Sequence, residues 1–538
     1  MKNNLILASM VILALMLSAC GELDKIDNEI PSTPIVDNGT LSITGKITFD
    51  KIGVNSNNMG LDYSNVKREP ARQVVVKAIG RLDEVVTETT TDDRGAYRLG
   101  NLPENAKVKI RVYAQMKKSS GDVTWDVNVV DNTNGDSQYV MEGSFASTGT
   151  VNSVRNLNAS LGWNPSRGYY SSVRASAPFA VLDSVYTAMK KVISADSKID
   201  FPLLKVNWSV NNVSAGNGTE SELRDGQIVT SHYDGENKLY ILGDENADTD
   251  EFDNHIIIHE WGHYFENKFS RADSIGGPHT EGDMLDMRLA FGEGFGNAWS
   301  AIATDDPIYY DTSGQHQGLG WAMNIENEQP NNPGWYSESS IQRILYDLYD
   351  SNDDGADRLS LGFTPIYDVL VGAQKRTPAF TSIFSFITGL YAQRPNDKSA
   401  INSILNSENI HEVQDAYGTG HHQLYLDMNV QTGANVCTST RYGISNKVDT
   451  HKYLLFTLPN AGRYLVRLTQ TNGRGADPDF GLYLSSPSFK LIGKAEEVNL
   501  RYQEGTYQLQ AGNYILDVSD YNDLREACFN ATVERDYN

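Results

Sequence analysis

One run of five residues constrains this chain more than any other part of its sequence. The run is His259-Glu260-Trp261-Gly262-His263, in a segment apolar enough for a buried helix. On a helix, residues i and i+4 share a face, so the two imidazoles point the same way, about 6 Å apart. This spacing suits two nitrogen ligands of one Zn²⁺, with the intervening Glu260 beside an open coordination position. The run therefore predicts a catalytic zinc centre on a helix over 254–269.

A catalytic zinc takes three protein ligands, so the third must come from elsewhere in the chain. The predicted ligand is Glu293, with Asp283 and Asp286 as the alternatives. Glu293 lies in the run Phe291-Gly292-Glu293-Gly294-Phe295-Gly296-Asn297, and residues 298–302 continue helically. Each glycine in a helix costs about 1 kcal/mol relative to alanine. Three glycines in five residues therefore indicate a close approach, either to the zinc helix or to a substrate.

The combination of the histidine motif with a downstream glutamate resembles the gluzincins, the thermolysin-like group of zinc metallopeptidases. The three-histidine class needs a histidine six residues past His263, where this chain has Phe269. The resemblance covers about residues 150–435, and it is closer to secreted bacterial zinc metallopeptidases that carry Gly-Glu-Gly-aromatic-Gly-Asn-Ala. It implies an α+β zincin-type domain that hydrolyses peptide bonds of protein substrates, with Glu260 as the general base.

Two further roles have candidates in the sequence. Thermolysin-like enzymes place an Asp four residues after the glutamate ligand, and this chain has Asn297 there. The Asn oxygen can still accept the second ring N–H of a ligand histidine, although without a charge. The oxyanion donor, commonly His or Tyr in this class, is expected downstream, and its candidates are Tyr336, His316, His421 and His422. A strand predicted at 239–243 offers an edge to which an extended peptide could add.

The first twenty residues are typical of an export signal. Lys2 precedes an apolar run over 5–17 that is too short to span a bilayer, and Leu17-Ser18-Ala19-Cys20 ends it. This ending resembles the lipobox of bacterial lipoproteins, which implies that Cys20 is lipidated; an ordinary secretory signal is the alternative. Residues 21–42 are polar and predict a linker. We therefore expect an extracytoplasmic protein anchored to the bacterial cell envelope, at the outer membrane or cell surface, through its lipid alone.

Stretches rich in predicted strands flank the central region. Within 43–165, the turn Asp92-Asp93-Arg94-Gly95 and the following strand resemble the transthyretin-like sandwich appended to many secreted peptidases. Residues 433–538, with Ala-Gly turns before Tyr-rich strands, resemble the bacterial pre-peptidase C-terminal domain. The predicted fold is thus an N-terminal β-sandwich, a central zincin-type domain over 166–432 and a C-terminal β-sandwich. Helices are expected from Ser176, over 254–269, and near 285–302, 338–350, 378–392 and 398–406.

Cysteine usage and net charge limit the compartment and the partners. With Cys20 assigned to the lipid, Cys437 and Cys528 remain, and in an oxidising compartment they predict a disulfide; two buried thiols are the alternative. The net charge of −24, from 45 basic and 69 acidic residues, argues against nucleic acid and anionic lipid as partners. The expected partner is a protein or peptide substrate.

Two acidic stretches are candidates for binding Ca²⁺. Residues 350–355 begin like a calcium loop, but Leu361 at the twelfth position has no ligand atom, which favours a solvated turn. The run 244–253 could also hold Ca²⁺, with an ordinary charged loop as the alternative.

Three functions are compatible with these motifs. The intact set of His259, Glu260, His263 and Glu293 favours a zinc peptidase, with endopeptidase action expected. The alternative is a surface-binding or adhesin lipoprotein with a vestigial peptidase domain. An aminopeptidase on the same scaffold is the third hypothesis. The Gly-x-Met-Glu-Asn-type motif that would hold a substrate amine is not found in the sequence.

Overall fold

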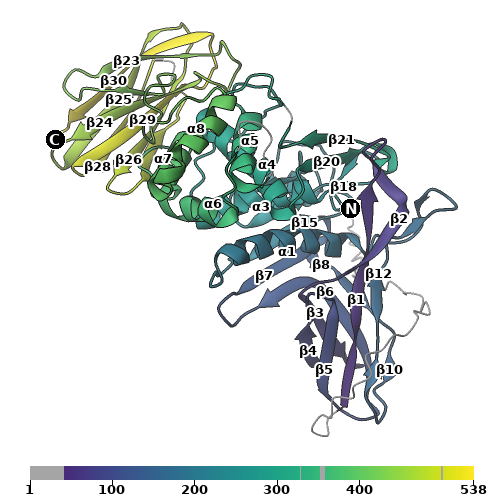
Figure 1. Ribbon diagram of the computed structural model, residues 1–538. Helices are drawn as coiled ribbons and strands as arrows, with labels where there is room; N and C mark the ends of the chain where they lie inside the picture. Colours follow the sequence, from purple (N-terminus) through teal and green to yellow (C-terminus); the bar gives the residue numbers. More distant parts are fainter. Residues whose placement is uncertain (1–40, 328, 352–357, 499–500, 538) are drawn as a thin grey trace, which may run out of the picture.

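The computed structural model describes residues 41–327, 329–351, 358–498 and 501–537. The molecule is multidomain and rich in sheet, with its helices in the middle (Figure 1). The predicted export signal, Cys20 and all but the end of the predicted linker lie outside the described residues, as do residues 352–355 of the first calcium candidate. None of the described helices is both long enough and apolar enough to cross a bilayer.

Two sheets make up the N-terminal part. The first has β1 at its centre, and its strands are β1 (Leu41–Val54), β2 (Leu61–Pro70), β5 (Ala96–Leu102), β11 (Ser153–Val154) and β12 (Leu157–Ala159). The second has the order β16-β17-β15-β7-β6-β3-β4, with three short strands attached. Its strands are β3 (Val74–Ile79), β4 (Val85–Thr90), β6 (Lys107–Lys118), β7 (Trp125–Asp131), β8 (Ser137–Gln138), β9 (Val140–Glu142), β10 (Ala146–Ser147), β15 (Leu204–Trp208), β16 (His232–Tyr233) and β17 (Lys238–Ile241). In β6, buried and half-buried residues alternate because one face covers the core.

The second sheet crosses the domain boundary predicted at residue 165. Strand β7 pairs in parallel with β15, from Leu204 opposite Val127 to Asn207 opposite Val130. One continuous buried cluster also joins residues of both parts and extends from Ile43 to Ile515. The linker boundary shifts as well, because residues 41 and 42 already belong to β1. The predicted boundary at 165 therefore falls between two strands of one sheet, and pairing between strands so far apart in sequence leaves no local signal.

Eight α-helices are present among the described residues. They are α1 (Ala177–Ala195), α2 (Glu220–Arg224), α3 (Asn254–Phe269), α4 (Met287–Thr304), α5 (Glu338–Tyr349), α6 (Phe363–Val369), α7 (Ile383–Gln393) and α8 (Lys398–Ser407). Six lie where the sequence predicted helices, whereas the short helices α2 and α6 were not predicted. Helix α1 begins after Ser176 with Pro178 in its first turn, where a missing N–H costs nothing. Helices α3 and α4 lie side by side among the central helices, and both are almost entirely buried.

A small four-stranded sheet adjoins the start of α3. Its order is β18-β19-β20-β21, and its strands are β18 (Gly243–Asp244), β19 (Asp248–Thr249), β20 (Ile308–Ser313) and β21 (Leu319–Asn324). A separate hairpin consists of β13 (Trp163–Asn164) and β14 (Tyr169–Tyr170). Asp253 immediately precedes α3, but its side chain does not cap the helix and instead accepts hydrogen bonds from the backbone N–H and hydroxyl of Thr312. This residue therefore ties the start of α3 to β20.

The C-terminal part is a pair of sheets around its own buried core, as the sequence predicted (Figure 1). The strands of one sheet are β22 (Tyr425–Asp427), β24 (His451–Leu458), β26 (Pro478–Ser486), β27 (Lys490–Ala495) and β29 (Gly512–Asp520). Those of the other are β23 (Ala434–Ser439), β25 (Gly462–Asn472), β28 (Tyr502–Leu509) and β30 (Glu526–Arg535). Strand β22 pairs with β24, so this part starts before the predicted boundary at 433.

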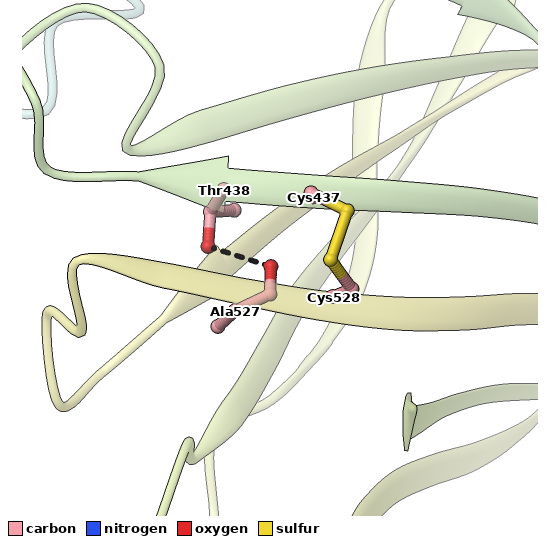
Figure 2. The surroundings of a disulfide bond; sticks show 4 residues. All are labelled: Cys437, Thr438, Ala527 and Cys528. Carbon is pink, nitrogen blue, oxygen red and sulfur yellow. Dashed lines mark hydrogen bonds between the residues drawn. A yellow bond between two sulfur atoms is a disulfide. The ribbon is translucent and has the colours of Figure 1, made fainter. Parts of the chain in front are cut away.

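A disulfide and a buried ion pair hold this part together and to the helices. Cys437 and Cys528 are bonded across the directly opposed strands β23 and β30 (Figure 2). Next to the disulfide, the hydroxyl of Thr438 donates to the carbonyl of Ala527. At the boundary with the helices, buried Arg288 of α4 lies 2.8 Å from the carboxylate of Asp517 in β29. The helix that carries Glu293 is therefore anchored to the C-terminal sheets.

Candidate metal centre

Three side chains from two helices converge on one point. His259 and His263 come from α3 and Glu293 from α4, and one potential ligand atom of each lies within 4.8 Å of the others. The Nε2 atoms of the two histidines are 3.0 Å apart. Glu293 Oε2 lies 3.2 Å from His259 Nε2 and 3.5 Å from His263 Nε2. Two imidazoles and one carboxylate form the donor set of a catalytic zinc site with an open fourth position.

The electrostatics of the three groups favour charge separation among them. Burial opposes ionisation of Glu293, but the adjacent His263 and His259 outweigh it and hold the pKa of the carboxyl well below its ordinary value. Burial likewise disfavours the charged form of His263, yet Glu293 raises the pKa of this imidazole well above 6.5. Ionised Glu293 is therefore stabilised by positive charge next to it. A bound divalent cation would supply that charge in place of the imidazole protons.

Close packing of α3 on α4 sets the position of His259. A Cβ atom added at Gly296 would lie 2.8 Å from Cε1 and 2.9 Å from Nε2 of the His259 ring. A Cβ at Gly262 would lie 3.0 Å from Trp299, and one at Gly294 would lie 2.5 Å from Cβ of Ile341 in α5. The glycines therefore permit close helix contact, and the donor set fits a Zn²⁺ ligated by His259, His263 and Glu293.

Two further side chains orient the histidines. Nδ1 of His259 lies 2.8 Å from Oδ1 of Asn297, so the ring N–H donates to the amide oxygen and leaves Nε2 free for a metal. Nδ1 of His263 lies 3.7 Å from Oε2 of Glu266, which is an ion-pair distance and too long for a hydrogen bond. Burial raises the pKa of Glu266 to about 7, although His263 opposes the shift. Glu266 was missed from the sequence; its i+3 spacing from His263 was the available signal.

Replacing Asn297 with Ala is expected to weaken zinc affinity about 10–100-fold, because His259 loses the acceptor that fixes its tautomer and orientation. Competition with a chromophoric zinc chelator measures this change. Asn297→Asp is the matched variant, since it keeps an acceptor oxygen and should stay near the wild-type affinity. Equal zinc affinities for Asn297→Ala and the wild type would contradict the proposal that Asn297 orients His259.

Glu260 lies between the metal-binding histidines in sequence and beside a sheet edge in space. Its Oε2 accepts a 2.9 Å hydrogen bond from the backbone N–H of Tyr233 in β16. The predicted edge strand at 239–243 corresponds to β17, but β17 is paired on both sides, with β15 and β16. The outermost strand at this end of the sheet is therefore β16. The short strand was missed because two residues carry no period-2 pattern.

The other sequence candidates have different surroundings. His316 lies against Trp163, and its carbonyl accepts a hydrogen bond from Tyr63, so it faces the N-terminal part. The Tyr336 ring packs edge-on against Trp335. His421 packs on Phe384, and His422 forms an ion pair with Asp449. Among the described residues, no hydrogen bond or ion pair joins any of these four to the three converging side chains. The sequence could not exclude them because distance in space depends on the packing of separate elements.

The alternative third ligands are likewise engaged elsewhere. Asp286 forms a 2.9 Å ion pair with Arg288, and Asp283 lies 3.4 Å from Lys447. Arg288 and Lys447 therefore compete with any role for these two carboxylates at the histidines.

His279 and Glu338 border the centre, and neither was predicted from the sequence. Nε2 of His279 lies 3.5 Å from Oε2 of Glu293 and 3.5 Å from Oε2 of Glu338. Burial raises the pKa of Glu338, against the opposing effect of His279. His279 is in the segment between α3 and α4 and is partly exposed, so it can face both the centre and solvent. No motif marks either residue.

Residues 206–396 match the family described as Mycolysin C-terminal domain. The matched stretch includes α3, α4 and all three converging residues, so this part of the chain is related to peptidases. No match was found among curated proteins.

Two solved structures are similar over a fifth of the chain. One is the pre-peptidase C-terminal domain of collagenase from Bacillus anthracis, with 15% identity over 20% of this chain and 92% of that chain, at a TM-score of 0.16. The other is CorA, a surface-associated copper-binding protein of Methylomicrobium album BG8, with 10% identity over 21% of this chain and 98% of that chain, at a TM-score of 0.18. At these TM-scores neither similarity informs the fold or function of this chain.

Proposed function

We propose that this chain is a gluzincin-type zinc peptidase that hydrolyses peptide bonds of extracytoplasmic protein substrates. The observation that carries the proposal is the convergence of His259 Nε2, His263 Nε2 and Glu293 Oε2 within 3.5 Å of one another. A vestigial domain would be under no constraint to retain this set together with Glu260. The peptidase-related match over 206–396 supports the same conclusion.

The reaction uses the residues around the centre in distinct roles. His259, His263 and Glu293 would hold Zn²⁺, which polarises a substrate carbonyl and lowers the pKa of a water molecule. Glu260 takes the proton from that water and then passes it to the leaving amine. The hydrogen bond from the N–H of Tyr233 to Oε2 holds the Glu260 carboxylate in place for this role. Asn297 keeps His259 in the tautomer that presents Nε2.

Substrate binding and oxyanion stabilisation use the rim of the centre. Strand β16 ends the sheet beside Glu260, and an extended peptide could align with this edge, where the N–H of Tyr233 is held by Glu260. His279 takes the role of oxyanion donor in place of the candidates Tyr336 and His316, because its Nε2 is within 3.5 Å of Glu293. Cys20 would anchor the enzyme to the cell envelope through a lipid, and the flanking sheets would serve as non-catalytic accessory domains.

Metal content and proteolysis of the full chain test the proposal together. The purified protein should contain one zinc per chain and cleave a denatured protein substrate. A zinc chelator should abolish the cleavage, and added Zn²⁺ should restore it. Stoichiometric zinc without cleavage of any peptide would contradict the peptidase assignment, and release of N-terminal residues only would favour an aminopeptidase.

A further inference from the structure

A second cluster of acidic side chains lies at the start of α3, apart from the zinc ligands. It consists of Asp248 in β19, Asp250 in the following loop and Asp311 in β20. One carboxylate oxygen of each lies within 4.8 Å of the others. Asp250 is 2% exposed, so the cluster is not an ordinary solvated acidic surface. All of its potential ligand atoms are oxygens, unlike those of the zinc centre.

Three buried carboxylate oxygens at this place have no hydrogen-bond partner among the described residues: Oδ1 of Asp248, of Asp250 and of Asp253. Oδ2 of Asp250 accepts a hydrogen bond from the hydroxyl of Ser231. Asp253 is a fourth carboxylate, 1% exposed, and its Oδ2 accepts both hydrogen bonds from Thr312. Asp253 is close to the cluster in the fold, because it follows Asp250 by three residues and is bonded to Thr312, the residue next to Asp311 in β20. Buried oxygens without partners are costly unless something else satisfies them.

No cationic side chain of the described residues forms an ion pair with these four carboxylates. The nearby guanidinium of Arg174 is bound to Glu251 at 2.7 Å. The indole N–H of Trp321 donates to Asp311 at 3.0 Å, but it carries no charge. Burial, and after it the charge of Asp311, raises the pKa of Asp248 to about 7. When these carboxylates are ionised, no positively charged side chain of the described residues balances their charge by an ion pair.

We propose that Asp248, Asp250 and Asp311 bind one Ca²⁺, with Asp253 as a further carboxylate beside it. Calcium takes oxygen ligands at about 2.3–2.6 Å in a flexible geometry, which suits carboxylates up to 4.8 Å apart. Zinc prefers nitrogen and sulfur ligands, which are not present here. The site differs from the zinc centre in its ligands and location, so it goes beyond the proposed peptidase function.

The position of the cluster means that a bound cation would join the start of α3 to β20. Asp250 and Asp253 precede α3, whereas Asp311 belongs to β20. A bound Ca²⁺ would therefore fasten the start of the zinc helix to the β20–β21 hairpin, in addition to the hydrogen bonds from Thr312 to Asp253. His259 follows only six residues after Asp253 on the same helix.

Calcium binding can be measured on the full chain without any activity assay. The background is Glu260→Gln, which suppresses self-cleavage, and every arm receives one equivalent of Zn²⁺ after removal of other metals. Calcium is then added up to about 10 mM, with Mg²⁺ as a parallel arm, because sites of extracellular modules have Kd values of about 0.1–1 mM. Bound calcium is counted by equilibrium dialysis, and thermal unfolding is followed in the same samples.

We expect one Ca²⁺ per chain and a Tm that rises by roughly 5 °C at a hundredfold excess over Kd. Asp250→Asn should weaken calcium binding at least tenfold, while its Tm without calcium should equal or exceed that of the parent, because a buried like charge is removed. Glu245→Gln is the matched control, since it removes one charge from the neighbouring turn between β18 and β19, outside the cluster, and should leave calcium binding unchanged.

Two outcomes would overturn the proposal. One is a protein with full zinc content that binds no calcium at about 10 mM. The other is an Asp250→Asn variant that binds calcium like its parent. If calcium has no effect and Tm instead rises as pH falls from 8 to 6, protons shared among the carboxylates stabilise the cluster, which also excludes the cation.

Discussion

Replacing Glu260 with Gln is expected to lower kcat/KM for a peptide substrate by about 10²–10⁴-fold while the zinc content stays at one per chain. The amide cannot take up the proton of the attacking water, so the step that needs a general base loses it. The zinc ligands His259, His263 and Glu293 are unchanged, so metal binding should persist. The amide can still accept the hydrogen bond from Tyr233, which keeps the side chain in place. Initial rates with a quenched fluorescent peptide and zinc analysis of the same sample measure both quantities.

Glu236→Gln is the matched control for this experiment. Glu236 is an exposed glutamate in the loop between β16 and β17, and its replacement should leave kcat/KM near the wild-type value. If Glu260→Gln retained wild-type kcat/KM, Glu260 would not be the base. If the variant lost its zinc together with its activity, the loss could not be assigned to proton transfer.

Gly296→Ala is expected to weaken zinc affinity by about 10–100-fold, with a matching loss of activity at limiting zinc. The added Cβ would lie 2.8–2.9 Å from three atoms of the His259 ring, so either the ring or helix α4 must move. Overpacking of this kind costs about 1–3 kcal/mol, and here the strain acts directly on a ligand. Competition with a zinc-binding chromophore measures the affinity.

Gly292→Ala, on the same helix, separates this contact from the general effect of alanine in a helix. Its Cβ would meet Cβ of Ser274 at 3.5 Å, an ordinary van der Waals distance. Alanine also has a higher helix propensity than glycine, by about 1 kcal/mol. This variant should therefore keep wild-type zinc affinity and unfold at the same or a higher temperature. Equal affinities for Gly296→Ala and Gly292→Ala would contradict a direct effect on His259.

The sequence predicted the central helices well because their signals are local. Helix α5 was expected over 338–350 and runs over Glu338–Tyr349, since its apolar residues repeat with the helical period and Ser337 caps its start. Sheet organisation was harder to predict. The pairing of β7 with β15 spans the predicted boundary at 165. Strand β16, at one end of the sheet, has only two residues, too few to show an alternation of apolar and polar side chains. Strand pairing depends on which elements meet in space, and the sequence of a strand does not identify the strand with which it pairs.

The sequence alone determined that two imidazoles share a helix face, because the i, i+4 geometry of His259 and His263 is a local property of an α-helix. With Cys20 expected to carry a lipid, it also left Cys437 and Cys528 as the predicted disulfide. Only the tertiary structure brought Glu293, rather than Asp283 or Asp286, to those imidazoles, and placed Asn297 and His279 beside them. Likewise, it turned part of an acidic run into a buried cluster by adding Asp311 from a distant strand. Such contacts arise from the packing of one element on another. The burial and the proximity of charges that shift the pKa values of these groups exist only in the packed structure.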